Sequence, residues 1–404
     1  MKEKGHSVSR RKFLTSAILT STGIVAGMNS ASAKSNSPKS KKRKKAIYRT
    51  LGKTGIRVPV VGMGKLPADN PRLVKAALDN GLAFIDTALM YYNGQHEKMI
   101  SKVIQDYPRD SYVIATKIKP PGYNYRTGMY SKKATEESFL KKFDKSMKNL
   151  GLDYVDILYH HDVSTRESAL LEPVLNAMRK IKESGRAKHL GISTHKNEPE
   201  TIRAAIESGV YEVVLTTYNF KQDHLAEMDQ AIKEAAAAGF GIVGMKNLAG
   251  GYLDKHKKKP VNAKAALRWA LQNPDIHAVV PGFTNFEQME ECVEVLHNIK
   301  MSKKERNDLL AASDETGMYC NACGKCVAKC SKGLPVPELM RAYMYTYGYR
   351  QPGQAQDLLI SLDVQNNPCT DCDECTVECV KSFDVAQKIS DVTRLIDVPR
   401  EFIV

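Results

Sequence analysis

The chain has 404 residues, of which 42% are hydrophobic and 26% charged, a composition typical of a globular protein with two or three structural units. The formal net charge is +15, but residues 1–45 contribute +11 of it and residues 46–404 only +4. A nucleic-acid partner is therefore not expected, because the excess positive charge belongs to the N-terminal segment and not to a binding surface.

The first 33 residues have the pattern of an export signal. Residues 9–14 read Ser-Arg-Arg-Lys-Phe-Leu, which resembles the twin-arginine motif, and a mildly apolar stretch follows as far as Met28. That stretch is shorter than the ~20 residues of a membrane-spanning helix. Cleavage after Ala33 would leave residues 34–45 as a basic linker. We predict export by the twin-arginine translocase to the periplasm; a disordered basic N-terminus is the alternative.

Residues 46–300 alternate between two kinds of pattern. Residues 48–59 contain two short runs around a glycine turn and are typical of a hairpin. Short apolar runs then predict strands at residues 60–64, 83–86, 112–117, 154–161, 189–193, 213–218, 241–245 and 277–282. Apolar residues at helical spacing predict helices at residues 71–80, 97–107, 135–150, 169–184, 198–208, 225–238, 263–272 and 286–296.

Eight strand–helix units in succession predict a closed parallel (β/α)8 TIM barrel. An open, doubly wound sheet is the alternative, but no Gly-x-Gly-x-x-Gly turn follows the first strand. Enzymes built on such barrels carry their catalytic groups at the carboxyl ends of the strands. Polar residues stand at these ends in this chain: Asp86, Lys117, His161, Ser193 and Lys246.

Residues 48–296 resemble the aldo-keto reductases, and the resemblance is carried by four residues in order along the chain. It implies that Asp86, Tyr91, Lys117 and His161 are catalytic. His160 is the alternative to His161, but the family's spacing of five residues from the aspartate of the fourth strand favours His161.

The chemistry explains these residue types. Hydride reduction of a carbonyl leaves an alkoxide that needs a proton, and a tyrosine has a pKa near ~10, which makes it a weak acid at neutral pH. We therefore expect the Lys117 ammonium to lower the pKa of Tyr91, the general acid and base. Asp86 is expected to hold Lys117, and His161 to orient the substrate oxygen.

The resemblance also implies a nicotinamide site, which this chain alters. A Ser-Asn pair, a Gln and an aromatic residue are usual in the family, and this chain has Ser193 with Thr194, Leu215 and Met245 in their places. Where an arginine for a 2′-phosphate is usual, the chain has a glutamine. The candidate residues for a dinucleotide are Ser193, Thr194, Leu215, Met245, Lys246, Gly250, Gly282, Thr284, Gln288 and Glu291. NAD and NADP both remain candidates. Tyr92 replaces a usual glycine and is expected to narrow the pocket.

Residues 301–404 contain eight of the nine cysteines, in two runs with the spacing C-x2-C-x2-C-x3-C. This spacing is typical of ferredoxin-type [4Fe–4S] clusters, in which the fourth cysteine of each run binds the other cluster. One cluster would then take Cys320, Cys323, Cys326 and Cys379, and the other Cys369, Cys372, Cys375 and Cys330. Two self-contained sites are the alternative, because 38 residues separate the runs. Zinc sites and disulfides are further alternatives.

Helices are expected at residues 302–315, 334–347 and 355–362, so the second unit is predicted as a mainly helical, ferredoxin-like domain. The whole chain resembles the aldo-keto reductases that carry such a domain. The leading hypothesis is an exported oxidoreductase that interconverts a small carbonyl compound and an alcohol and exchanges single electrons with a redox partner. A catalytically altered barrel, serving as an electron-transfer or structural module, is the alternative, and a binding protein for a carbonyl compound is a third.

Overall fold

The computed structural model describes residues 45–370, 372 and 375–403, and these belong to one compact unit. The predicted signal peptide, residues 1–33, and all but the last residue of the predicted linker lie outside the described residues. None of the helices in the described ranges is long and apolar enough to cross a membrane.

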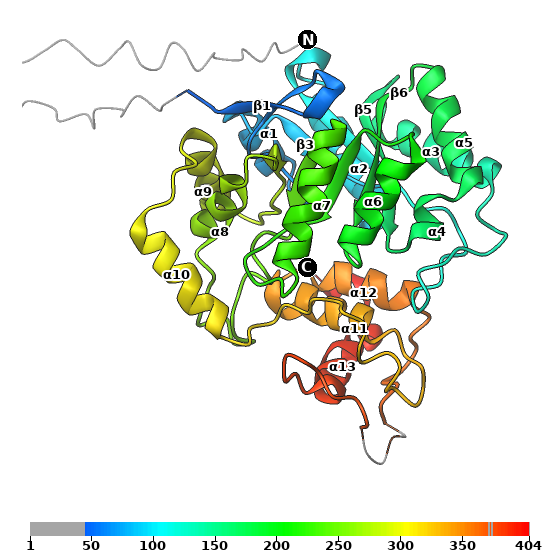
Figure 1. Ribbon diagram of the computed structural model, residues 1–404, viewed down its shortest axis with the longest axis vertical. Helices are drawn as coiled ribbons and strands as arrows, with labels where there is room; N and C mark the ends of the chain where they lie inside the picture. Colours follow the sequence, from blue (N-terminus) through cyan, green and yellow to red (C-terminus); the bar gives the residue numbers. More distant parts are fainter. Residues whose placement is uncertain (1–44, 371, 373–374, 404) are drawn as a thin grey trace, which may run out of the picture. The chain divides into compact units, whose positions relative to one another are not determined.

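A parallel sheet forms the centre of the fold (Figure 1). Within the described residues it has seven strands, and their order around the sheet is their order in the chain. They are β3 (Phe84–Asp86), β4 (Val113–Ile118), β5 (Val155–Val163), β6 (Ala187–Thr194), β7 (Val213–Thr217), β8 (Gly241–Met245) and β9 (Ala278–Val279). Residues 60–64 close the ring, since Val61 pairs with Val279 and Met63 with Ile85. This is the predicted (β/α)8 barrel, with its first strand reduced to single bridges.

Helices link the successive strands and surround the sheet (Figure 1). They are α1 (Pro71–Asp79), α2 (Gln95–Ile104), α3 (Glu136–Leu150), α4 (Arg166–Ala169), α5 (Glu172–Glu183), α6 (Glu198–Ser208), α7 (Leu225–Ala238), α8 (Ala263–Gln272) and α9 (Phe286–His297). The helix predicted at residues 169–184 begins at Glu172, with Pro173 in its first turn, where a residue without an N–H group fits best. The short helix α4 before it was not predicted.

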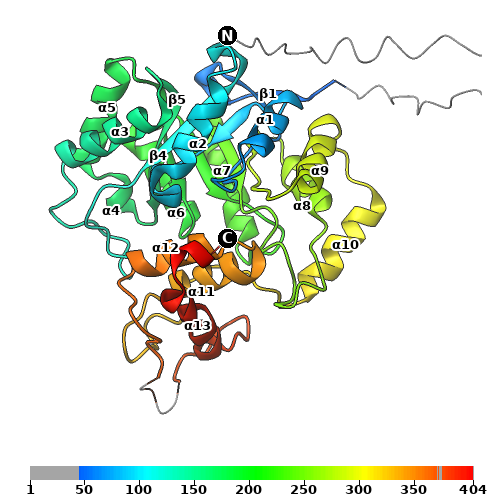
Figure 2. The ribbon, with the colours of Figure 1, turned by 180° about the vertical axis from the view of Figure 1, so that it is seen from behind.

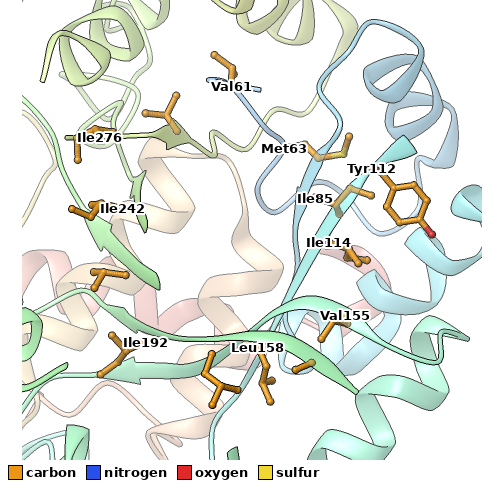
Figure 3. Close-up of a cluster of buried hydrophobic side chains, with 14 of the residues drawn as sticks. Val61, Met63, Ile85, Tyr112, Ile114, Val155, Leu158, Ile192, Ile242 and Ile276 are labelled. Carbon is orange, nitrogen blue, oxygen red and sulfur yellow. The ribbon is translucent and has the colours of Figure 1, made fainter. Parts of the chain in front are cut away.

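The strands bury both faces, because successive side chains point to opposite sides of a strand. On β3, Phe84 belongs to the core inside the barrel, while Ile85 belongs to the layer between sheet and helices. On β5, Tyr159 lies inside and Leu158 outside. Figure 3 shows part of the outer layer, with Ile85 next to side chains from the neighbouring strands. This alternation decides which polar residues at the strand ends face the barrel axis.

A hairpin closes the amino-terminal end of the barrel. It consists of β1 (Tyr48–Thr50) and β2 (Arg57–Pro59), which pair in antiparallel fashion as predicted. Its turn packs against the start of β8, where the Lys53 N–H donates to the Gly239 carbonyl at 2.8 Å. Leu51 is fully buried there and belongs to the core inside the barrel.

Replacing Leu51 with alanine is therefore expected to lower the free energy of unfolding by about 2–4 kcal/mol, because it leaves a cavity at the closed end of the barrel. Leu310→Ala is the matched control: that leucine is 66% exposed, and its loss should change stability by less than about 0.5 kcal/mol. Chemical denaturation followed by circular dichroism measures both. Equal effects of the two substitutions would contradict the role given to Leu51.

Most of the C-terminal segment lies across the carboxyl-end face of the barrel, and its first helix packs against α8 (Figures 1 and 2). Its elements are α10 (Lys303–Asp314), α11 (Val336–Tyr343), the π-helical turn η4 (Met344–Gly348), α12 (Pro352–Ser361) and α13 (Val385–Thr393). Leu339 of α11 shares a buried apolar cluster with Phe220 and Val261, which come from loops of the barrel. The segment is mainly helical as predicted, although α13 was not foreseen.

Candidate active site

Three of the predicted catalytic residues face the barrel axis because of strand alternation. Asp86 lies two residues after Phe84, Lys117 two after Ala115 and His161 two after Tyr159, and the three earlier residues all belong to the core inside the barrel. His160 has the opposite orientation: its ring nitrogens lie 3.2 Å from the hydroxyls of Tyr130 and Tyr211. His161, not its neighbour, therefore lines the central cavity.

Lys117 is at the centre of the site. Its Nζ lies 2.6 Å from Asp86 Oδ2, 2.8 Å from the Thr87 carbonyl oxygen and 3.3 Å from the Tyr91 hydroxyl. Lys117 and Asp86 are both buried. The structure thus brings together the Tyr91 phenol, the Lys117 ammonium and the Asp86 carboxylate, although 31 residues separate Asp86 from Lys117 in the sequence.

The loop after β3 carries Tyr91 to this position. Tyr91 begins the 3-10 turn η2 (Tyr91–Gly94), and its ring meets that of His161 edge-on, with 6.0 Å between the ring centroids. Tyr92 and Asn93 have φ angles of 50° and 53°, in the left-handed region. A glycine would adopt this conformation without strain, which explains why glycine is the usual residue at the position of Tyr92.

Tyr92 itself is directed elsewhere. Its ring lies under the Lys65 ammonium, with 3.9 Å from Nζ to the ring centroid, and reaches towards Gly353 of α12. Tyr92 is not among the described residues that line the cavity. The expectation that it narrows the pocket is therefore wrong, because the left-handed turn points its ring at the C-terminal segment.

Burial governs the acidities of the site. It raises the pKa of Tyr91 well above the usual value; Asp86 and Asp162 raise it further, and Arg341 opposes them. Burial lowers the pKa of Lys117 and raises that of Asp86, while each partner's charge opposes the shift of the other. The charge of Asp86 offsets that of Lys117, so the ammonium does not outweigh the effect of burial on Tyr91. The net pKa shift of Tyr91 is therefore upward, opposite to the direction expected from the sequence.

A cavity of about 910 Å³ opens at these residues. It runs from Asp86, Tyr91 and His161 to the loop after β9 and the start of α9. The C-terminal segment contributes part of its wall, with Arg341, Tyr345 and Tyr349 among others. A volume of this size is at the upper end of the range for ligand sites in proteins, ~300–1,000 Å³.

Asp162 joins the C-terminal segment to the catalytic strand. It follows His161, has a φ of 59° and is buried. Its carboxylate lies 2.8 Å from Lys119 Nζ and 3.2 Å from Arg341 of α11, and Arg341 also bonds Glu338. The surrounding cations hold the pKa of Asp162 well below its usual range, although burial opposes them. The sequence does not indicate this ion pair, because 179 residues separate its partners.

The candidate dinucleotide residues fall into two sets. The cavity is lined by Met245, Lys246, Gly282, Thr284, Gln288 and Glu291. The other four lie outside that lining: Leu215 is in the core of the barrel, Ser193 Oγ accepts from the Asp162 N–H at 2.9 Å, and Thr194 Oγ1 donates to the Lys196 carbonyl at 3.0 Å. The Gly250 N–H, expected to face a pyrophosphate, donates to the Tyr349 hydroxyl at 3.1 Å.

All nine cysteines, each of them among the described residues, are free of disulfide bonds. Burial raises the pKa of Cys320 to about 12, and the thiols that raise it further are Cys326, Cys379 and Cys323. Burial likewise raises the pKa of Cys326 to about 11, with contributions from Cys323 and Cys379. The last cysteine of the second run therefore lies near enough to Cys320 and Cys326 to raise the pKa of both.

The second group has the reciprocal composition. Burial raises the pKa of Cys369, and the neighbouring thiols raise it further; these are Cys372, Cys375 and Cys330. The ends of the two runs also touch, since Thr376 Oγ1 donates to the Lys329 carbonyl at 2.6 Å. In the part of the chain that the structure describes, no group of three or more His, Cys, Asp or Glu side chains is arranged to hold a metal ion.

A small second cavity, of about 20 Å³, lies between the first cysteine group and the active site. Cys320 lines it together with His195, Lys246 and Arg341. These last three residues also line the large cavity. The group that contains Cys320 is therefore separated from the large cavity by one layer of side chains.

Comparison with known proteins agrees with the fold. The sequence profile of the Aldo/keto reductase family matches residues 64–265, half of the chain, and ends before both cysteine runs. L-galactose dehydrogenase of Arabidopsis thaliana is 26% identical over 295 residues, which cover 63% of this chain and 90% of that protein. L-glyceraldehyde 3-phosphate reductase of Escherichia coli K12 is 25% identical over 317 residues, covering 64% and 90%.

Among solved structures, an aldo-keto reductase from Bacillus halodurans superposes with a TM-score of 0.55 at 19% identity, over 66% of this chain and 96% of that one. At this identity the likeness concerns the fold alone. Together, the profile match and the sequence relatives show that the chain is an oxidoreductase and belongs to the aldo/keto reductase family.

Proposed function

We propose that this protein is an exported iron–sulfur oxidoreductase that interconverts a small carbonyl compound and an alcohol, with Tyr91 as the general acid and base. One observation carries the proposal: a buried phenol lies 3.3 Å from a lysine ammonium, which in turn lies 2.6 Å from an aspartate, at the wall of a large cavity. Phenol, ammonium and carboxylate are the groups that carbonyl reduction needs to deliver a proton.

Reduction adds a hydride to the carbonyl carbon and a proton to its oxygen. The raised pKa of Tyr91 keeps the phenol protonated at neutral pH, so it can donate to the developing alkoxide. Lys117 then donates a hydrogen bond to the phenolate oxygen, and its contact with Asp86 fixes it for that task. His161 faces the same cavity and orients the substrate oxygen; burial lowers its pKa well below the usual value, so it acts as a neutral imidazole.

A nicotinamide dinucleotide is a suitable source of the hydride, and the cavity is large enough to hold one. Met245 would pack against the ring, and Thr284, Gln288 and Glu291 would lie along the far part of the molecule. When bound, the dinucleotide would supply or accept the hydride. The protein's own residues align the carbonyl with it and move the proton.

The pH dependence of the two directions follows from the raised pKa of Tyr91. At saturating concentrations of a neutral carbonyl substrate, kcat for reduction is expected to stay level from about pH 6 to about pH 9, because the phenol stays protonated beyond its ordinary pKa of ~10. Alcohol oxidation needs the phenolate and is expected to speed up as pH rises over the same range. Initial-rate assays of reduction and of oxidation, in one series of buffers, measure both pH dependences. A fall in reduction with a midpoint near neutral pH would argue against Tyr91 as the acid.

The cysteine groups support two [4Fe–4S] clusters. A single zinc ion needs four sulfurs about 2.3 Å from one centre. In a [4Fe–4S] cluster each cysteine thiolate binds a different iron atom, so the four cysteine sulfurs lie further apart than around a single zinc ion. Each of the two groups of mutually perturbing thiols contains the fourth cysteine of the other run, which is the composition that crossed ligation of two clusters requires. The clusters would exchange single electrons with a redox partner, and the one that contains Cys320 lies nearer to the active site.

Export of the folded protein is consistent with this chemistry. Eight thiols crossing into an oxidising compartment unfolded would form disulfides. A twin-arginine signal, for which the N-terminal residues qualify, would allow the clusters to be assembled first.

The proposal is tested on the full-length mature chain purified without oxygen. Absorbance and electron spin resonance spectra, with iron and sulfide counts, should give two clusters per chain. Oxidation of NADH or NADPH in the presence of small aldehydes, ketones and the reverse alcohols should be saturable. Cluster-containing protein that turns over none of these compounds with either nucleotide would refute the enzymatic part of the proposal.

One observation favours a second function, an electron-transfer or structural module. The Gly250 N–H is occupied by Tyr349, so a backbone group expected at the dinucleotide is bonded to the C-terminal segment instead. In this case NADH and NADPH should leave the fluorescence of the single tryptophan, Trp269, unchanged. Saturable quenching would reject the module and favour the enzyme.

A further inference from the structure

Lys65 is a cation in the active-site cavity that the mechanism does not use. It directly follows the strand segment at residues 60–64, is 8% exposed and lines the large cavity. The next residue holds the turn, because the Leu66 N–H donates to His96 Nε2 at 3.1 Å. Within the described ranges, the Lys65 ammonium has no hydrogen-bond acceptor and no carboxylate at ion-pair distance, although its backbone is fixed.

The surroundings of this ammonium are aromatic. Its Nζ lies 3.9 Å from the centroid of the Tyr92 ring and 5.4 Å from that of Tyr91. Such contacts attract a cation without neutralising its charge. They also place the ammonium and the proton-donating phenol at the same part of the cavity.

The carboxylate that acts on Lys65 most strongly is already engaged. Asp357 of α12 raises the pKa of Lys65, but it is paired with Arg400 at 2.6 Å, and Arg400 acts in the opposite direction. Burial dominates and lowers the pKa of Lys65 to about 7. A buried charge without a partner is costly. An incoming anion would therefore accept a hydrogen bond from the Lys65 ammonium and would favour the charged form of that lysine.

The other cations near the catalytic residues are differently placed. Lys117 is bonded to Asp86, and Lys119 and Arg341 are bonded to Asp162. Lys246 also lines the cavity, but its ammonium lies 5.5 Å from the ring centroid of Tyr345, on the side of the Cys320 group. Of these described cations, Lys65 is the one that has no acid partner and faces Tyr91.

We propose that Lys65 binds an anionic oxygen group, a carboxylate or a phosphate, of the ligand held against Tyr91. The favoured source is the substrate, which makes the substrate class an acidic carbonyl compound such as an oxo acid or a phosphorylated aldehyde. The inference rests on the proposed function for the role of Tyr91. The other source of the same chemistry is the pyrophosphate of a dinucleotide, and the experiment separates the two.

The test compares charged and neutral carbonyl compounds of the same skeleton. The pairs are succinate semialdehyde with its methyl ester and glyceraldehyde 3-phosphate with glyceraldehyde. Wild type is expected to prefer the charged member of at least one pair. Lys65→Met should lower kcat/KM for that member by about 10- to 100-fold, the loss of one hydrogen bond to a charged group, and leave the neutral member within about twofold. Lys65→Arg keeps the charge and should retain most of the preference.

A binding measurement without turnover keeps the inference separate from the proposed function. With no nucleotide present, the charged compound should raise the thermal unfolding midpoint of wild type but not of Lys65→Met. If charged compounds bind through Lys65 and nothing is turned over, the proposed function fails and the anion site stands. Weaker quenching of Trp269 fluorescence by NADH or NADPH in Lys65→Met, with the charged-to-neutral ratio unchanged, assigns the anion to the dinucleotide. The proposal is overturned if neither the preference, the stabilisation nor the nucleotide affinity depends on Lys65.

Discussion

Tyr91→Phe is expected to lower kcat for carbonyl reduction by about 10²- to 10⁴-fold, the usual contribution of a positioned general acid. The substitution removes the hydroxyl that lies 3.3 Å from Lys117 Nζ and keeps the ring, whose edge-on contact with His161 should hold the loop in place. The affinity for substrate should change much less than kcat, because proton transfer takes place only in the transition state.

Tyr92→Phe is the matched control for this variant. It removes the same atom from the next residue of the same turn, and that ring faces Lys65 and α12 and is not part of the described cavity lining. Its kcat should stay within about threefold of wild type, since it loses no group in contact with the reacting atoms. Equal losses in the two variants, or full turnover in Tyr91→Phe with an intact circular dichroism spectrum, would remove Tyr91 from the mechanism.

The part of this site that could be predicted depends on local periodicity. Two-residue alternation along β3 and β5 sets Asp86 and His161 on the face of Phe84 and Tyr159, and neighbouring parallel strands bring their carboxyl ends to one edge. The same alternation turns His160 outward towards Tyr130. A sequence pattern contains this information, because it depends only on residues within one strand.

The ion pair of Asp162 with Arg341 could not be predicted in this way. Its partners lie 179 residues apart, in the barrel and in the C-terminal segment, and nothing in the sequence of α11 indicates the strand it meets. The predicted direction of the pKa shift of Tyr91 was wrong for a related reason. The sequence predicts an ammonium near the phenol, held by Asp86, but it does not show how deeply the phenol is buried.

The turn at Tyr92 illustrates a third kind of limit. Replacement of a glycine by a large residue indicated a narrower pocket, as long as the backbone was assumed to keep its path. The structure has the left-handed conformation at Tyr92 and sends the side chain to the C-terminal segment, which the family profile does not cover. A segment added to a known fold can change which residues of that fold face the ligand.

The double variant Cys326→Ala with Cys379→Ala is expected to keep one intact [4Fe–4S] cluster, about 4 of ~8 iron atoms per chain. The physical reason is the mixed composition of the thiol groups. Cys379 perturbs Cys320 and Cys326 of the other run, so both substitutions affect the same cluster. If each run instead held its own cluster, this pair of substitutions would damage both, and almost no iron would remain.

The reciprocal double variant, Cys326→Ala with Cys330→Ala, gives the opposite result for the two arrangements. These cysteines belong to one run, but Cys330 lies with Cys369, Cys372 and Cys375, so crossed ligation predicts the loss of both clusters. Self-contained sites predict that one cluster survives. Iron and sulfide analysis, with quantified electron spin resonance of the dithionite-reduced proteins, measures the number of clusters in each variant.

Cys292→Ala is the control for both experiments. Cys292 is buried in α9 and lies outside both runs, so its loss should leave the cluster count unchanged. The two double variants distinguish the arrangements only as a pair. A variant that loses its clusters because the protein misfolds would lose them from both sites, whereas crossed ligation requires one double variant to keep a cluster that the other has lost. Zinc in place of iron in all of these proteins, or no metal at all, would contradict the cluster proposal itself.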